Sequence, residues 1–180
     1  MATPPVFTAG AVLTAAQMND IGFWLVKTQT IGSAVASVTV TDAFSADYDN
    51  YVISVTGGVA SAGTSAALTL GSASTGYYFF TVSGLYSGTT ITGSNTSNGA
   101  SFASVVRATA NSLHGVISVF DPFNAKTTHV LAQTSASGTG AGYFTAGGFL
   151  NDTTSYTAFT LTLATGTMTG GNIKVYGYRN

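Results

Sequence analysis

The chain contains no cysteine and no glutamate, and charged residues fill only 6% of its 180 positions. Without cysteine there is no disulfide, no thiolate nucleophile and no Cys-ligated zinc, so stability must come from buried area and backbone pairing. An ordinary globular domain has about 25% charged residues, so hydroxyl, amide and backbone groups must cover most of this surface. Such a surface repels other copies of the chain weakly and predicts self-association.

Basic residues and long apolar runs are scarce as well. Five Lys and Arg stand against six Asp, which gives a net charge of -1, and so few cations predict no nucleic-acid partner. The longest apolar run near the start covers only residues 23–26, whereas a membrane-spanning helix needs about 20, so no membrane insertion is expected. The opening residues 1–5 have neither a basic leader nor an apolar core, so no secretory signal is expected.

Thr and Ser together occupy 49 of the 180 positions, and this composition favours strands and turns over helices. Short apolar runs alternate with Gly-rich and Asn-rich turns, and in residues 51–55 and 159–163 every second side chain is apolar, as in half-buried strands. Hairpins without helices between them indicate antiparallel pairing, and the expected fold is an all-β, antiparallel, jelly-roll-like β-sandwich. The predicted strands are residues 35–41, 50–56, 66–70, 77–82, 101–108, 113–120, 127–133, 142–149, 157–163 and 172–178.

The first 30 residues are expected to form a separate piece in front of a β-sandwich domain over residues 31–180. Pro4 and Pro5 stiffen an extended arm, and Thr14 can cap a helix predicted over residues 15–27. Its apolar side chains follow helical spacing, so one face must be buried, either against the chain's own β domain or against neighbouring chains or a larger assembly. The predicted anchoring residues are Leu13, Met18, Ile21, Trp24 and Leu25.

Four consecutive aromatic residues, Tyr77, Tyr78, Phe79 and Phe80, place rings on both faces of one predicted strand. A core of this size cannot bury both members of each adjacent pair, so one member of each pair should face out. An exposed apolar patch of this kind commonly marks a contact surface. The four residues are therefore the candidate interface of a homo-oligomer.

Residues that could carry chemistry are few and scattered. His114, His129, Asp121 and nineteen serines supply the parts of a catalytic triad, but no Gly-x-Ser-x-Gly motif places a nucleophile between a strand and a helix. Two His without Cys or Glu make an incomplete metal site, and residues 47–50 lack the Gly and the terminal Glu of a calcium loop. The sequence therefore predicts no enzyme, no catalytic residue, no metal and no cofactor.

Three segments are similar to virion proteins of tailed bacteriophages. Residues 7–19, FTAGAVLTAAQMN, resemble the N-terminal segment of minor tail, fibre or capsid-surface proteins. Residues 43–51, AFSADYDNY, resemble an entry strand of the same group, and residues 170–178, GGNIKVYGY, resemble its closing strand. The resemblance implies a trimeric β-sandwich on the virion, held by an N-terminal arm and helix. Expected partners are therefore two further copies of the chain and other virion proteins.

Two functions remain open. In the first, the protein is a tail or fibre knob that contacts host cell-surface glycan, with the rings of Tyr86, Tyr143 and Tyr156 offered for sugar stacking. In the second, it is a capsid-decoration or head-fibre protein that ties neighbouring capsid subunits together and binds no ligand. Both locate the protein on the virion.

Overall fold

The computed structural model describes residues 10, 12, 22–138 and 140–178. In these ranges the chain forms thirteen strands and no helix, and the paired strands run antiparallel. The all-β, antiparallel class expected from the sequence is confirmed. The described part of the chain contains no helix that is long and apolar enough to cross a membrane.

Each of the ten predicted segments overlaps a strand, and three further strands, β1, β6 and β12, were not predicted. The strands in chain order are β1 (Trp24–Thr30), β2 (Ser37–Val40), β3 (Asn50–Ala60), β4 (Thr64–Leu70), β5 (Tyr77–Leu85), β6 (Ile91–Gly99), β7 (Phe102–Thr109), β8 (Ser112–Phe120), β9 (Thr128–Ala136), β10 (Gly142–Leu150), β11 (Phe159–Leu163), β12 (Met168–Thr169) and β13 (Asn172–Tyr178).

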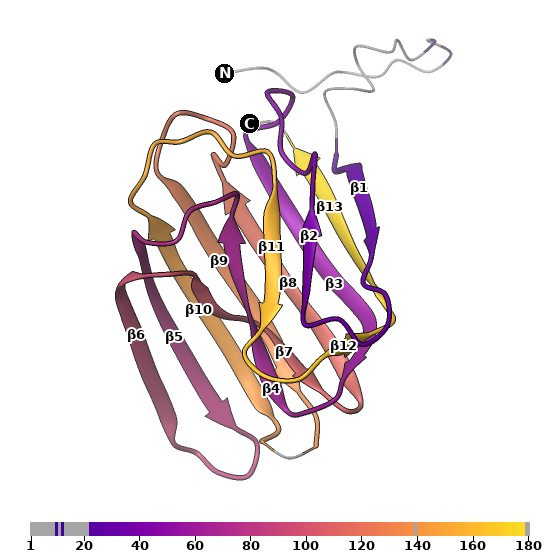
Figure 1. Ribbon diagram of the computed structural model, residues 1–180, viewed down its shortest axis with the longest axis vertical. Coiled ribbons are helices and arrows are strands. Elements are labelled where there is room, and N and C mark those ends of the chain that lie inside the picture. Colours follow the sequence, from indigo (N-terminus) through magenta and orange to yellow (C-terminus); the bar gives the residue numbers. More distant parts are fainter. Residues whose placement is uncertain (1–9, 11, 13–21, 139, 179–180) are drawn as a thin grey trace.

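The strands form two rows. A shorter row has the order β2-β11-β4-β7, and a longer row has the order β1-β13-β3-β8-β9-β10-β5-β6. The β7–β8 hairpin, in which Thr109 pairs with Ser112, joins the two rows, and β12 pairs with the far end of β3. Figure 1 shows the shorter row lying in front of the longer one, so the arrangement is sandwich-like.

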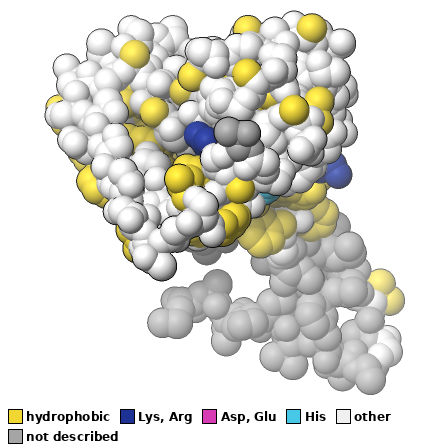
Figure 2. All heavy atoms as spheres, turned by 90° about the horizontal axis from the view of Figure 1, so that it is seen from below, with side chains coloured by type: hydrophobic (Ala, Val, Ile, Leu, Met, Phe, Trp, Pro, Cys, Tyr) yellow, Lys and Arg dark blue, Asp and Glu magenta, His cyan; other side chains and the backbone are white. Residues whose placement is uncertain are grey.

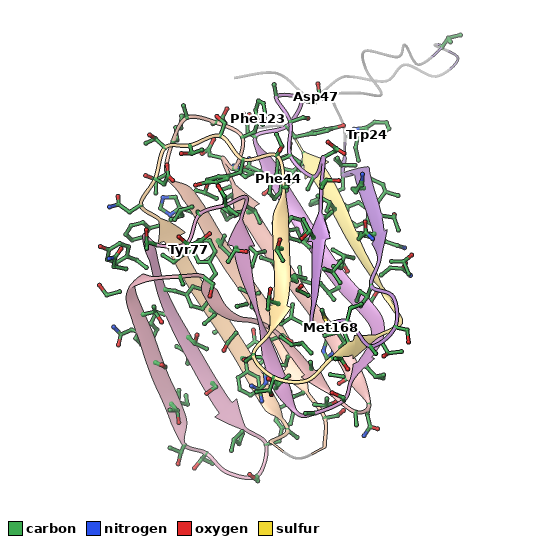
Figure 3. All side chains as sticks on the ribbon, viewed as in Figure 1. Trp24, Phe44, Asp47, Tyr77, Phe123 and Met168 are labelled. Carbon is green, nitrogen blue, oxygen red and sulfur yellow. The ribbon has the colours of Figure 1, made fainter. Side chains whose placement is uncertain are left out.

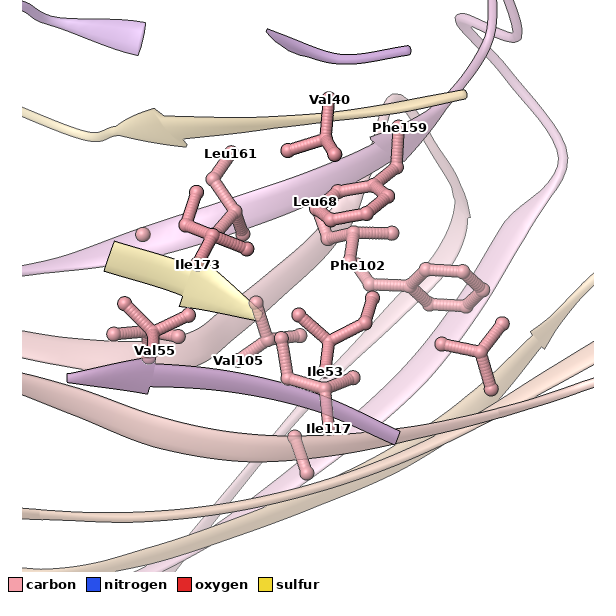
Figure 4. Close-up of a cluster of buried hydrophobic side chains, with 14 of the residues drawn as sticks. Val40, Ile53, Val55, Leu68, Phe102, Val105, Ile117, Phe159, Leu161 and Ile173 are labelled. Carbon is pink, nitrogen blue, oxygen red and sulfur yellow. The ribbon is translucent and has the colours of Figure 1, made fainter. Parts of the chain in front are cut away.

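The core lies between the two rows because apolar side chains alternate along most strands. On β4 every second residue from Thr64 to Leu70 is buried, and β9 and β13 show the same period of two. Figure 4 shows side chains from both rows meeting in this space. Those labelled in it are Val40, Ile53, Val55, Leu68, Phe102, Val105, Ile117, Phe159, Leu161 and Ile173.

The helix predicted over residues 15–27 is wrong in its last part. Trp24–Thr30 forms β1, which pairs with β13 at the edge of the longer row. A bulge between Leu25 and Lys27 breaks the alternation of this strand, and Val26 packs against the core. The rest of the predicted helix, up to residue 21, lies outside the described residues.

Two glycine-rich segments that fall between the predicted strands, residues 57–58 and 93–99, belong to strands. Gly57 and Gly58 lie inside β3, where the pairing with β8 shifts between Val55 and Gly58. Gly58 needs to be glycine, since a Cβ there would sit 2.5 Å from the carbonyl oxygen of Gly170. Residues 93–99 lie in β6, which pairs with β5.

The shorter row does not cover the whole of the longer one. It ends at β7, whereas the longer row continues through β10 and β5 to β6, which Figure 1 shows extending past the front row. Most residues of β6 are accordingly exposed. The inner face of the β5–β6 pair is therefore open to solvent near the lower end of the molecule.

Candidate functional site

The four consecutive aromatic residues of β5 divide between the two faces of the longer row. Tyr77 and Phe79 point into the core, where they are 0% and 5% exposed, whereas Phe80 is 52% exposed and Tyr78 is half-buried on the outer face. The ring of Tyr78 stacks on Phe149 of the neighbouring strand at a centroid distance of 5.0 Å. One member of each pair faces out, as the sequence indicated.

Tyr77 contributes to the chain's own core. Its ring meets Phe102 edge-on at 4.8 Å, and its hydroxyl accepts a hydrogen bond from the Leu70 amide and donates one to the Ala73 carbonyl. Burial raises the pKa of this hydroxyl. Figure 3 shows Tyr77 within the molecule. Of the four aromatic residues, only Tyr78 and Phe80 can reach a partner.

Apolar side chains lie in two neighbouring lines across the outer face of the longer row, with Ser118, Gln133 and Thr145 between them. Strand register places one residue of each strand side by side, from β13 through β3, β8, β9 and β10 to β5. Leu131 in this line is 57% exposed, and Val116 in the next line is 48% exposed. We call this set the outer apolar surface; its members are Tyr176, Val52, Leu131, Phe80, Val116 and Val82.

The outer apolar surface has a shallow depression of about 240 Å³ between Phe80 and Leu131. Gly147 forms its floor, and a Cβ on Gly147 would meet the end of Leu131 at 2.9 Å. The ring of Phe80 also covers Gly93 of β6, whose Cβ would lie 2.9 Å from it. Glycines under two large apolar side chains thus leave a concave apolar spot on a broad face.

The three tyrosines proposed as sugar platforms lie in three different places. Tyr156 is 6% exposed, and its hydroxyl donates to the Asp152 carboxylate at 2.7 Å, so its ring cannot stack on a ligand. Burial and the Asp152 carboxylate raise the pKa of Tyr156 to about 12. Tyr143 is 44% exposed on the outer face of β10, and Tyr86 is 67% exposed in the turn after β5.

A cleft of about 330 Å³ lies beside Tyr86, on the open inner face of the β5–β6 pair. We call it the β5–β6 cleft. Its lining is mainly hydroxyl-bearing and consists of Ser83, Leu85, Ser87, Gly88, Thr90 and Thr92.

Of the five predicted anchoring residues, the structure describes two. Trp24 is half-buried at the start of β1, at the margin of the molecule in Figure 3. Leu25 is 55% exposed beside Tyr176, and Phe23 before it is 63% exposed and contacts the ring of Tyr178 at 5.1 Å. Leu13, Met18 and Ile21 lie outside the described residues.

The two histidines lie at opposite ends of the β8–β9 pair, and Asp121 follows Phe120, which pairs with His129. His114 on β8 forms a hydrogen bond of 2.9 Å with Ser135 through Nε2, whereas His129 lies at the other end of β9, against the ring of Phe149. Asp121 binds Asn124 and forms an ion pair with Lys126. Within the described ranges, no three His, Asp or Glu residues are grouped as metal ligands would be.

The sequence analysis missed Arg107, which is a partly buried cation inside β7. Its guanidinium lies over the Phe144 ring of the longer row, 4.3 Å from the ring centre. The side-chain Nε is buried and has no hydrogen-bond partner. The available signal was a single arginine inside a strand with no other charged residue, FASVVRAT.

Comparison with family models, with curated proteins and with solved structures found no match.

Proposed function

We propose that this protein is a non-enzymatic structural protein of a tailed-bacteriophage virion, a homotrimeric knob of the tail or fibre that contacts the host surface. The observation that carries the proposal is the outer apolar surface, an exposed apolar area on the broad face of a domain with very little charge. The similarity of residues 7–19, 43–51 and 170–178 to phage virion proteins supplies the kind of assembly.

The strand order supports a jelly roll. A jelly roll has the first, eighth, third and sixth strands in one sheet and the second, seventh, fourth and fifth in the other. The shorter row, β2-β11-β4-β7, follows the first order if strands are counted from β2. In the longer row, β3, β5 and β6 occupy the places of the second, fourth and fifth strands, and the meander β8-β9-β10 occupies that of the seventh. Jelly rolls are common in viral capsid proteins and in lectins.

Another copy of the chain is the natural partner for the outer apolar surface. Large exposed apolar areas on soluble proteins commonly mark contacts, and Phe80 and Leu131 each leave about half of their side chain in water. Among the described residues near the middle of this face, only Lys174 carries a full charge, so two such faces repel each other weakly. Association would remove these side chains from water.

Sedimentation of the purified protein tests the self-association. The wild type should sediment as a trimer, and a double variant, Phe80→Ser with Leu131→Ser, should sediment as a monomer because it loses the centre of the apolar surface. Val59→Ser is the matched control, since Val59 is an exposed valine that lies outside this surface. A wild-type protein that stays monomeric at high concentration would refute the assembly.

Electron microscopy of virions labelled on this protein would locate it. Label on the tail or fibre agrees with the proposal, and absence from the particle contradicts it. The alternative function, capsid decoration or a head fibre, predicts label on the head. It is favoured by exposed Leu25 on edge strand β1 and exposed Phe23 just before it, which a neighbouring capsid subunit would cover.

A further inference from the structure

The β5–β6 cleft and Arg107 lie at the same end of the molecule. Phe144, whose ring lies under the guanidinium of Arg107, pairs directly with Ser83 of β5. Ser83 in turn pairs with Thr92 of β6. Neighbouring strands are about 4.8 Å apart, so the ring under Arg107 lies about one strand spacing from Ser83. Both Ser83 and Thr92 line the cleft. The cation therefore lies over the strand next to the hydroxyl-rich cleft, although Arg107 does not itself line that cleft.

The loops at this end connect the same groups. The Tyr86 amide donates a hydrogen bond to the Ala141 carbonyl at 3.0 Å, which ties the turn after β5 to the loop before β10. Gly140 in that loop lies next to Arg107, since a Cβ there would be 4.0 Å from the guanidinium Nη2. Tyr86 precedes Ser87 in the cleft wall and leaves its ring exposed. Tyr86, the cleft and Arg107 thus lie around the same two loops.

The charge of Arg107 has no counterion among the described residues. The ion pairs found there join Lys27 to Asp42 and Lys126 to Asp121. Figure 2 views the molecule from this end and shows no gathering of acidic side chains around the basic ones. Burial lowers the pKa of the guanidinium, because desolvation disfavours its charged form. An oxyanion from outside would supply the missing counterion.

We propose that this end of the molecule binds an acidic saccharide. Arg107 holds the carboxylate or phosphate group of the ligand, because a guanidinium matches the geometry of both. The hydroxyls of Ser83, Ser87, Thr90 and Thr92 exchange hydrogen bonds with sugar hydroxyls, since each can both donate and accept. The ring of Tyr86 packs on one sugar face. This inference rests on the proposed contact with the host surface and names the chemical class of the ligand in that contact.

Titration calorimetry of the full chain tests the site. The probes are an oligogalacturonate, which carries carboxylates, a poly(glycerol phosphate), which carries phosphates, and a neutral malto-oligosaccharide. One of the two acidic probes should bind and the neutral one should not; whichever acidic probe binds identifies the oxyanion. Equal binding of the neutral probe, or binding of none, overturns the proposal.

Variants assign the binding to the residues. Arg107→Gln should weaken binding of the acidic probe at least about tenfold, as expected for loss of a charged hydrogen bond. Lys126→Gln, which removes a positive charge in the loop before β9, should leave binding unchanged. Tyr86→Ser and Thr92→Val change exposed residues outside the core and should each weaken binding, so the test survives if Arg107→Gln fails to fold. Unchanged affinity in Tyr86→Ser and Thr92→Val overturns the site.

The result is separable from the test of the proposed function. Binding by the purified chain with no label on virions would refute the virion role and keep the site. Label on the tail with no binding would refute the site and keep the virion role.

Discussion

The hydroxyl of Tyr51 forms two hydrogen bonds with the backbone of Ser45, accepting from its amide at 2.8 Å and donating to its carbonyl at 3.0 Å. Tyr51 is fully buried, and Ser45 lies in the segment that crosses from β2 in the shorter row to β3 in the longer row. One side chain therefore satisfies both polar groups of a residue in that crossing.

Tyr51→Phe should lower the free energy of unfolding by about 1–3 kcal/mol, because it leaves the Ser45 amide and carbonyl without this partner. Urea denaturation would measure the change. The control is Tyr48→Phe, which alters a half-buried neighbouring ring and should change stability by less than about 0.5 kcal/mol. Equal stability of Tyr51→Phe and the wild type would contradict the prediction.

Stability should fall at alkaline pH because of Tyr156. Burial, followed by the Asp152 carboxylate, raises the folded-state pKa of this residue from 10.0 to about 12. The stabilisation is complete below about pH 10 and is lost as the pH rises towards 12, because the unfolded chain releases the proton first. Urea midpoints across this interval should fall less steeply in Tyr156→Phe. Tyr51 and Tyr77, whose pKa values burial also raises, remain in both proteins, so the difference between the curves reports Tyr156.

Asp152 should produce the opposite dependence at acid pH. Hydrogen bonds from the Thr154 hydroxyl and then from Tyr156 lower the pKa of this carboxyl below its usual 3.8. Its contribution to stability is present above that value and is lost as the pH falls through the folded-state pKa. Asp152→Asn should therefore flatten the acid side of the stability curve. An unchanged acid side in this variant would show that the two hydrogen bonds do not stabilise the fold.

Two glycines of the β5–β10 pair should respond differently to alanine. A Cβ on Gly148 would overlap the Tyr78 carbonyl oxygen and lie 2.8 Å from the Cα of Phe79, whereas a Cβ on Gly84 would have no neighbour within 4 Å. Gly148→Ala should cost about 1–3 kcal/mol, as overpacking does, and Gly84→Ala should cost less than about 0.5 kcal/mol. Thermal unfolding measures both. Similar losses at the two positions would argue against the close approach of β5 and β10.

Removal of the N-terminal segment should abolish anchoring to the virion without affecting the fold only if the deletion stops before β1. A chain that begins at residue 23 keeps the pairing of β1 with β13 and should fold and self-associate, but should not join the particle. A chain that begins at residue 31 loses that pairing and the contact of Val26 with the core, and should unfold at a lower temperature. Normal incorporation of the first chain would contradict the anchoring role.

The sequence predicted strands well where one face is buried. In β13 and β11 the apolar residues fall on alternate positions, and both strands lie where they were expected. In β1 the bulge after Leu25 makes both Val26 and Lys27 half-buried. The consecutive apolar residues 23–26 have no period of two in the sequence, so nothing there indicated a strand. Strand β6 escaped prediction because almost none of its side chains is buried, and pairing with β5 alone defines it.

The candidate site was harder to predict from the sequence than the strands were. Tyr86 could be singled out because it lies in a Gly- and Ser-rich turn. The contact of Arg107 with Phe144 joins residues on different rows and depends on how β7 crosses to the longer row, which no local pattern encodes. The burial of Tyr156 likewise depends on the approach of its ring to Gly71, which no alternation in its loop indicates.

Strand β6 is an edge strand, and one side of its backbone pairs with no other described strand. Native sheets commonly guard such margins with lysine or proline, and Ile91–Gly99 contains neither. A second extended chain could therefore add to this margin by backbone hydrogen bonds alone. Storage life at high concentration would then depend on the protection of this nine-residue strand, however well the interior is packed.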